Sequence, residues 1–162
     1  MCVVIRQPKV DKINMGIDII SWAERKTSSG YEPIDGDELF EDHAPFGWKS
    51  YRIFSFLAGV PNYSEIKPIS EPRGLPDDVS NEIRENYNEW LPDGREPSWI
   101  SIRELNEFEY DQQIEDRRDG RNTVPIGHGL LTTYRKYLDP AFFPELRILN
   151  ECNADRIVFW FY

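Results

Sequence analysis

The sequence predicts one α+β domain with a small antiparallel or mixed sheet, three to five helices and a long ordered central loop. Three observations support this prediction. Apolar and polar residues alternate near the start of the chain, apolar residues recur at helical spacing in its middle, and the run RIVFWFY closes it. We assign residues 15–162 to the domain, because 162 residues suit one domain with a sizeable core. Residues 1–14 are expected to be either an extension before a start at Met15 or, through Val3–Ile5, a short added strand.

The first element is a predicted hairpin. Residues alternate from Gly16 to Arg25, so that Ile17 and Ile19 face one side and Asp18 and Ile20 the other. The turn TSSG follows, and YEPI returns as a second strand. Residues 35–45 are acidic and predicted to form a loop.

Two amphipathic helices are predicted next. Ser50 can cap the first, whose apolar face includes Ile53 and Leu57 and which exits at Gly59. The second is indicated by apolar residues at helical spacing from Val79 to Trp90.

A third helix has the clearest local signal. Ser101 and Glu104 match a capping box, and Ile100 and Leu105 match a hydrophobic staple, so the helix should run from Ile102 to about Tyr110.

The remaining elements follow a charged connector, EDRRDGRN. We expect a fourth helix over residues 130–138 and a short helix in PELRILNECN. The final apolar run is expected to be a central strand that pairs with the strand at Ile17 and buries Trp160 or Phe161.

The charge of the chain restricts its partners. The formal net charge is −10, which disfavours binding to nucleic acid or an anionic membrane. The net charge is compatible with a local basic pocket that binds a small anion. It is also compatible with an acidic surface that imitates nucleic acid and binds a DNA-binding protein. Cys2 and Cys152 form no disulfide framework, and the sequence shows neither a signal peptide nor a membrane span. These features predict a cytoplasmic protein, in the host cell if a phage encodes it.

Catalytic and metal signatures are weak. His43 and His128 have no metal-ligand spacing, and His128 lies between glycines, where a turn is a simpler interpretation than a proton-transfer group. No nucleophile elbow or phosphate loop is present, so no cofactor or metal is expected. A hydrolase using Asp18, Asp77 and Asp111 is the least favoured of the hypotheses.

The loop NYSEIKPISEPRGLPDD, residues 62–78, is the most informative segment for function. It has no helical or strand period, and irregular connections of this length tend to be functional or disordered. Its prolines and apolar residues favour order. Arg73 beside Gly74 suits a phosphate or carboxylate. The alternative is a structural loop in which Arg73 pairs with Asp77 or Asp78.

These residues, with neighbours near the ends of the loop, predict a site for a nucleotide-like ligand. Arg52 and Arg73 would hold phosphate, while Tyr51 and Trp99 would stack on a base. Gly74 would allow close backbone approach. Asp18, which we expect to be buried in its strand, would accept a hydrogen bond from the base or the ribose. The alternative is a structural role, in which Asp18 pairs with an arginine or a backbone amide. The predicted ligand-binding set is Asp18, Tyr51, Arg52, Arg73, Gly74, Asp77 and Trp99.

Several segments resemble a family of small proteins from bacteriophage and bacterial genomes with no assigned activity. The segments are MGIDI, YRIFSFLAGVPNYSEIKPISEPRGLPDDVS, SWISIRELNEFEYDQ and VFWF, and they span most of residues 15–162. Relatives carry a histidine shortly before the Ser-Trp pair, where this chain has Arg95, Glu96 and Pro97, so a histidine mechanism is not expected. The resemblance implies a phage setting, in which accessory proteins often counter host defence.

Two hypotheses follow, besides the hydrolase. The first is a non-enzymatic sponge that sequesters a nucleotide-like defence signal, with a homo-oligomer as one form it could take. The second is an acidic inhibitor that binds a host defence protein or DNA-binding protein, for which we expect acidic side chains in rows on one face.

Overall fold

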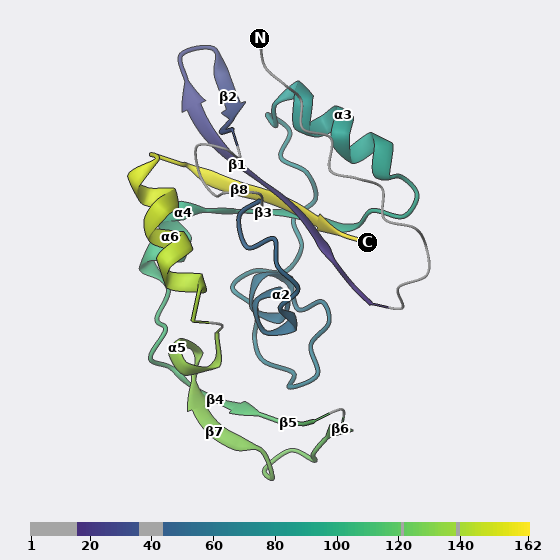
Figure 1. Ribbon diagram of the computed structural model, residues 1–162, viewed down its shortest axis with the longest axis vertical. Helices are drawn as coiled ribbons and strands as arrows, with labels where there is room; N and C mark the ends of the chain where they lie inside the picture. Colours follow the sequence, from purple (N-terminus) through teal and green to yellow (C-terminus); the bar gives the residue numbers. More distant parts are fainter. Residues whose placement is uncertain (1–15, 36–43, 121, 139) are drawn as a thin grey trace.

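The computed structural model describes residues 16–35, 44–120, 122–138 and 140–162. The predictions for residues 1–14, for His43 and for most of the acidic segment lie outside these ranges. Within them the chain has a mixed α+β fold, as expected, with five helices, one four-stranded antiparallel sheet and two small two-stranded sheets (Figure 1).

The main sheet has the strand order β2-β1-β8-β3. Its strands are β1 (Ile19–Thr27), β2 (Gly30–Pro33), β3 (Arg95–Ser101) and β8 (Arg156–Phe161). The hairpin of β1 and β2 is confirmed. Strand β3 was not predicted, and it pairs with β8 through a register shift between Arg95 and Ser98.

Strand β8 is the central strand, as the sequence predicts. It pairs antiparallel with β1, from Ile19 opposite Phe161 to Glu24 opposite Arg156, and its six residues are all buried. Because side chains alternate along a strand, Phe159 and Phe161 join one core while Val158 and Trp160 join another. The sheet therefore has a hydrophobic core on each face.

Helices cover both faces of this sheet (Figure 1). Helix α2 (Tyr51–Ala58) packs into the larger core, and α3 (Asn81–Trp90) covers the smaller, tryptophan-rich one. Helix α2 ends at Gly59, whose φ of 71° is the left-handed conformation that glycine adopts without a Cβ clash.

Two further helices pack on the side of α2. Helix α4 (Ile102–Glu107) begins at the predicted capping box, in which Ser101 and Glu104 bond each other's backbone amides. It ends three residues before the expected Tyr110. Helix α6 (Phe142–Glu151) begins before the short helix that was expected and contributes Phe142 and Leu149 to the larger core.

The prediction of a charged connector and a fourth helix over residues 130–138 was wrong. Residues 113–120 and 122–133 instead form an arm of paired strands at the bottom of Figure 1. Its strands are β4 (Gln113–Asp116), β5 (Arg118–Asp119), β6 (Asn122–Thr123) and β7 (Leu130–Thr133). Only α5 (Tyr134–Tyr137) is helical, because Thr133 caps it by accepting from the Lys136 amide.

The long loop between α2 and α3 crosses the edge of the sheet. Ile66 and Ile69 pack into the larger core, whereas Leu75 and Val79 pack into the smaller one. Between them, the Gly74 amide donates to the Pro97 carbonyl of edge strand β3 over 2.8 Å. The loop therefore covers an edge that would otherwise expose unpaired backbone groups.

A buried ion pair joins β1 and β8. Arg156 Nε lies 2.6 Å from Glu24 Oε2, and the two side chains are 5% and 0% exposed. Glu24 Oε1 also accepts from the amide of Ser80, which precedes α3, over 2.9 Å. The pair thus ties the sheet to the start of α3.

None of the helices in the described ranges combines the length and the apolar character that crossing a membrane would require.

Candidate functional site

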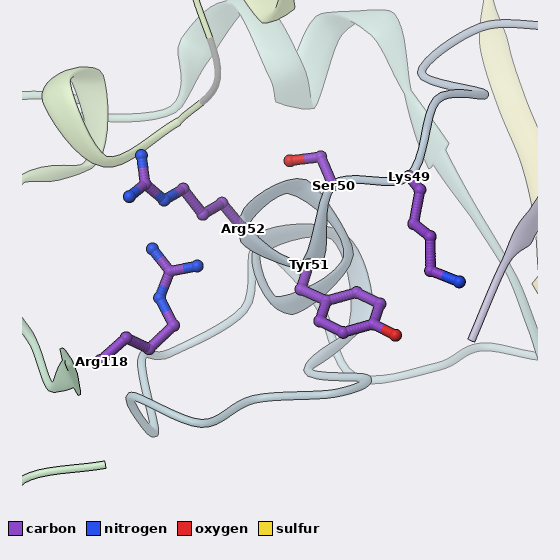
Figure 2. A pocket seen from close by; sticks show the side chains of 5 residues that line it. All are labelled: Lys49, Ser50, Tyr51, Arg52 and Arg118. Carbon is purple, nitrogen blue, oxygen red and sulfur yellow. The ribbon is translucent and has the colours of Figure 1, made fainter. Parts of the chain in front are cut away.

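A hollow of about 390 Å³ lies beside the first turn of α2. Lys49, Ser50, Tyr51 and Arg52 line it from one short stretch, and Arg118 lines it from the arm. Figure 2 shows Arg52 and Arg118 on one side of this turn and Lys49 and Tyr51 on the other. The volume falls within the range of small-molecule sites in proteins, roughly 300–1,000 Å³.

The sequence places positive potential at this turn. Ser50 caps α2 with its hydroxyl, which accepts from the Ile53 amide, and no acidic residue lies in the first turn. The amides of a first helical turn have no partner within the helix, and the helix dipole makes this end partly positive. An anion is therefore favoured beside Ser50.

Arg52 and Arg118 converge over one ring. Their guanidinium carbons lie 5.9 and 5.2 Å from the centroid of Tyr137, whose hydroxyl is 3.0 Å from Ser55 Oγ. Tyr137 belongs to α5 and is buried, and the guanidinium groups of Arg52 and Arg118 both lie near its ring. Like charges repel, so this convergence favours an anion between them.

The two arginines differ in how they are paired. Arg118 donates to both carboxylate oxygens of Asp116, each over 3.1 Å. Burial opposes ionisation of Asp116, but the hydrogen bonds from Arg118 and Ser64 outweigh it, and the pKa of this carboxyl lies below its ordinary value. No carboxylate among the described residues pairs with Arg52.

On the side of the hollow away from the arginines, Lys49 and Tyr51 contact the residues before β1. Lys49 Nζ lies 3.5 Å from Asp18 Oδ2 and 5.9 Å from the ring centroid of Tyr51, whose hydroxyl accepts from the Ile17 amide over 3.3 Å. A Cβ on Gly16 would come within 2.2 Å of Lys49 Nζ, so this close approach needs a glycine or a displaced lysine. The expectation that Asp18 is buried inside its strand was wrong: it precedes β1 and its side chain is 31% exposed.

The hollow is thus cationic in an acidic chain. Three cationic side chains line it, and two carboxylates, Asp18 and Asp116, pair with two of them. One positive charge, that of Arg52, remains uncompensated by the described residues, against a formal net charge of −10 for the whole chain.

The structure does not bring Arg73 to this hollow. Its guanidinium donates to Glu104 over 3.0 and 2.5 Å and to the Trp99 carbonyl over 3.2 Å. The hydrogen bond from Arg73 is the main reason that the pKa of Glu104 falls to about 2. Neither expected arrangement is present, because Arg73 forms no phosphate cradle with Arg52 and pairs with neither Asp77 nor Asp78.

The other predicted residues of this group lie with Arg73. The ring of Trp99 packs against the smaller core, and the Arg73 guanidinium covers it at 4.7 Å from its centroid. Gly74 has a φ of 78° and bonds β3, and Asp77 is exposed before α3. Tyr51 and Arg52 therefore line the hollow, and Asp18 pairs with the lining residue Lys49. The other predicted residues, Arg73, Gly74, Asp77 and Trp99, do not line it.

The carboxylates of the hydrolase hypothesis do not converge either. Asp18 pairs with Lys49, Asp111 pairs with Arg135 beside the arm, and Asp77 precedes α3. Within the described ranges no cluster of three or more His, Cys, Asp or Glu residues could hold a metal ion. His128 lies in a turn, in which its amide donates to the Pro125 carbonyl, as expected for a histidine between glycines.

Sequence reasoning missed Lys49 and Arg118 as lining residues. Lys49 directly precedes Ser50, the predicted N-cap of α2, so its position beside a helix N-terminus could have been inferred from the sequence. Arg118 belongs to the segment that was taken for a flexible connector, and nothing local places it beside α2.

The fold and this hollow define an α+β domain with a small cationic site at a helix N-terminus. No family model, curated protein or solved structure matches the chain.

Proposed function

We propose that the chain binds a small nucleotide-like anion in the hollow at the start of α2. The observation that carries this proposal is the convergence of Arg52 and Arg118 over Tyr137, with Arg52 left without a carboxylate partner among the described residues. Guanidinium groups bind phosphate with two parallel hydrogen bonds, and the unpaired amides of the first turn of α2 add donors nearby.

The second part of the ligand is inferred from Tyr51. Its ring borders the hollow on the side away from the arginines, so a phosphate beside Arg52 would leave an attached base near this ring (Figure 2). Stacking on an aromatic side chain tolerates any base, at roughly 1–3 kcal/mol per base. A phosphate with an attached aromatic group therefore suits both sides of the site.

The biological role that we propose is sequestration. A counter-defence setting, which the resemblance suggested by the sequence would imply, is part of this proposal: the protein would bind a nucleotide signal and withhold it from a host receptor. Sequestration needs no catalytic group, which agrees with the separate surroundings of Asp18, Asp77 and Asp111.

Isothermal titration with cyclic and linear nucleotides, and with inorganic phosphate and pyrophosphate, tests the proposal. Arg52→Gln should weaken binding about 10- to 100-fold, because a hydrogen bond to a charged group contributes roughly 1.5–3 kcal/mol. Arg147→Gln is the matched control, since Arg147 is 72% exposed on α6 and should bind as the parent does. Absence of heat from every ligand with folded protein, or equal affinity of both variants, would contradict the proposal.

Two further measurements separate its parts. Tyr51→Leu should weaken nucleotide binding but not phosphate binding, whereas Tyr51→Phe keeps the ring and should bind both. Chromatography of the ligand after prolonged incubation should recover it unchanged, and a product would favour an enzyme over a sponge.

A second candidate function has one observation in its favour. Glu82, Glu85 and Glu89 are exposed on α3, and their spacing of three and four residues puts them in one row. No ion pair with a described residue compensates these three carboxylates. We infer that α3 could dock on a basic surface of a host defence or DNA-binding protein.

This candidate predicts salt-sensitive capture of a host protein by the immobilised chain. Replacing the three α3 glutamates by glutamine should abolish the capture. Replacing Glu107 and Glu151, which are exposed on α4 and α6, should not. Equal capture by both variants would exclude α3 as the docking surface.

A further inference from the structure

Strand β7 and the turn before it expose unusual apolar surface. Five large hydrophobic side chains are exposed in the described residues, and three of them fall within six positions of the chain. They are Ile126, Leu130 and Leu131, exposed by 75%, 70% and 66%. Because successive side chains of a strand point to opposite faces, Leu130 and Leu131 leave exposed apolar surface on both faces of β7.

The backbone of β7 is also open along one edge. Thr133 lies opposite Gln113 in the register with β4, and the Tyr134 amide donates to the Gln112 carbonyl. Hydrogen-bonded and non-hydrogen-bonded pairs alternate along an antiparallel ladder, so Leu130 and Thr132 direct their backbone groups toward β4. The amides and carbonyls of Leu131 and Thr133 therefore point away from it, and no described strand pairs with that edge.

The edges of the main sheet are protected, and β4, the partner of β7, carries Glu115 and Asp116, so β7 differs from these strands. Edge strand β2 carries Glu32 and ends at Pro33, and the central loop bonds edge strand β3 through Gly74. Charges, prolines and covering loops are the usual devices that prevent edge pairing. The sequence of β7, LLTT, has none of them.

Hydrogen bonds order the turn that precedes β7. Glu115 of β4 accepts from the amides of Gly127 and Gly129 over 2.8 and 2.7 Å, which fixes the turn before β7. A Cβ on Gly129 would lie 2.6 Å from the Asp116 carbonyl oxygen, so the turn requires glycine there. An ordered edge loses less conformational entropy on pairing than a mobile one.

Charge favours a second copy of the chain at this edge. Residues 122–134 form the longest run in the sequence without Asp, Glu, Lys or Arg. Two molecules with a net charge of −10 repel each other, so the contact between them is least opposed where the surface carries no charge. Anionic lipid and nucleic acid offer no group that this neutral strand would prefer.

We propose that the protein forms a two-fold dimer in which β7 pairs antiparallel with β7 of a second copy. The two-fold axis passes beside Thr132, so that Leu131 of each copy lies opposite Thr133 of the other. This register uses every outward backbone group of Leu131 and Thr133, giving about four hydrogen bonds, and no other register within the four-residue strand uses as many. A continuous sheet with the order β4-β7-β7-β4 results.

Sedimentation equilibrium of the full chain tests the dimer. The parent should show a concentration-dependent dimer between about 1 μM and about 1 mM, and Leu131→Lys should raise its dissociation constant at least about tenfold. Leu91→Lys is the matched control, because Leu91 is 51% exposed after α3, and it should leave the constant unchanged. A monomer at all concentrations, or equal effects of the two variants, overturns the proposal.

Disulfide trapping tests the register independently. The two Thr132 residues would form a non-hydrogen-bonded pair, whose Cα separation of about 4.5 Å suits a disulfide. In a chain with Cys2→Ser and Cys152→Ser, Thr132→Cys should yield a covalent dimer on mild oxidation, and Asn88→Cys, on an exposed face of α3, should not. Failure of Thr132→Cys to cross-link at concentrations where the parent is dimeric overturns this register.

Discussion

Removing Arg156 should destabilise the protein more than removing any exposed arginine. Its guanidinium bonds Glu24 over 2.6 Å and Asp78 over 2.8 Å, and it lies 3.5 Å from the ring centroid of Tyr31. In Arg156→Met an apolar chain of similar length replaces it. Glu24, which is fully buried, would then keep only the Ser80 amide as a partner among these contacts.

The magnitude follows from the burial of the pair. Leaving one partner of a buried ion pair uncompensated typically costs about 3–5 kcal/mol. A natural domain has only about 5–15 kcal/mol of stability, so the loss is a large fraction of it. With a urea m-value of about 2 kcal/mol/M, the unfolding midpoint should fall by roughly 1.5–2.5 M.

Urea unfolding followed by tryptophan fluorescence measures this change. The matched control is Arg147→Met, because Arg147 and Glu151 are 72% and 68% exposed and lie 3.9 Å apart. An exposed pair contributes about 0–1 kcal/mol, so its midpoint should barely move. Adding Glu24→Leu to Arg156→Met should recover part of the loss, because no charge is then buried alone. Equal midpoints for the two single variants would refute the reasoning.

Three other predictions concern the loop, helix α2 and the larger core. The hydrogen bond from Arg73 lowers the pKa of Glu104 from 4.5 to about 2, so the ionised carboxylate stabilises the fold fully above pH 4.5 and this stabilisation is lost as the pH falls through 2. Glu104→Gln should therefore flatten the plot of unfolding free energy against pH over that range. An unchanged plot would show that the pair contributes nothing to stability. Gly59→Ala should lower the free energy of unfolding by about 1 kcal/mol, because φ is 71° there. Calorimetry checks this, and Gly127→Ala, at an exposed position with φ 88°, should lower the free energy of unfolding by a similar amount. Phe56→Ala should lower the free energy of unfolding by about 3–5 kcal/mol, since Phe56 is fully buried against four aromatic rings. A decrease below about 1 kcal/mol, measured by chemical unfolding, would contradict this packing.

Elements with a local signal were predictable from the sequence. The capping box at Ser101 and Glu104 and the glycine exit of α2 at Gly59 are short-range features, and the structure contains both. The central position of β8 was predictable because its apolar run is nearly continuous. A strand that is covered on both faces is apolar at successive positions, whereas a half-exposed strand alternates.

Elements whose conformation depends on distant residues were not predictable. Strand β3 begins with Arg95, Glu96 and Pro97, and its register shift interrupts the alternation that would reveal a strand. Residues 130–138 contain both a strand and a short helix, so an averaged apolar pattern indicated one helix.

The candidate site shows the same division. Tyr51 and Arg52 were predicted because they begin an amphipathic helix near the central loop. Arg118 reaches the hollow only because the arm folds back beside α2 and Asp116 holds its guanidinium. Arg73 was misplaced because its partner, Glu104, is 31 residues away in sequence, and no local pattern distinguishes that carboxylate from Asp77 or Asp78.

The central position of β8 has a consequence for synthesis of the chain. Strands β1 and β3 do not pair with each other, and each bonds to a strand that the ribosome makes after both of them. Until residues 156–161 emerge, the β1-β2 hairpin lacks its second neighbour and β3 has no partner strand. Such non-local closure is slow and exposes the chain to aggregation, so chaperone dependence should be greatest before residues 156–161 have emerged.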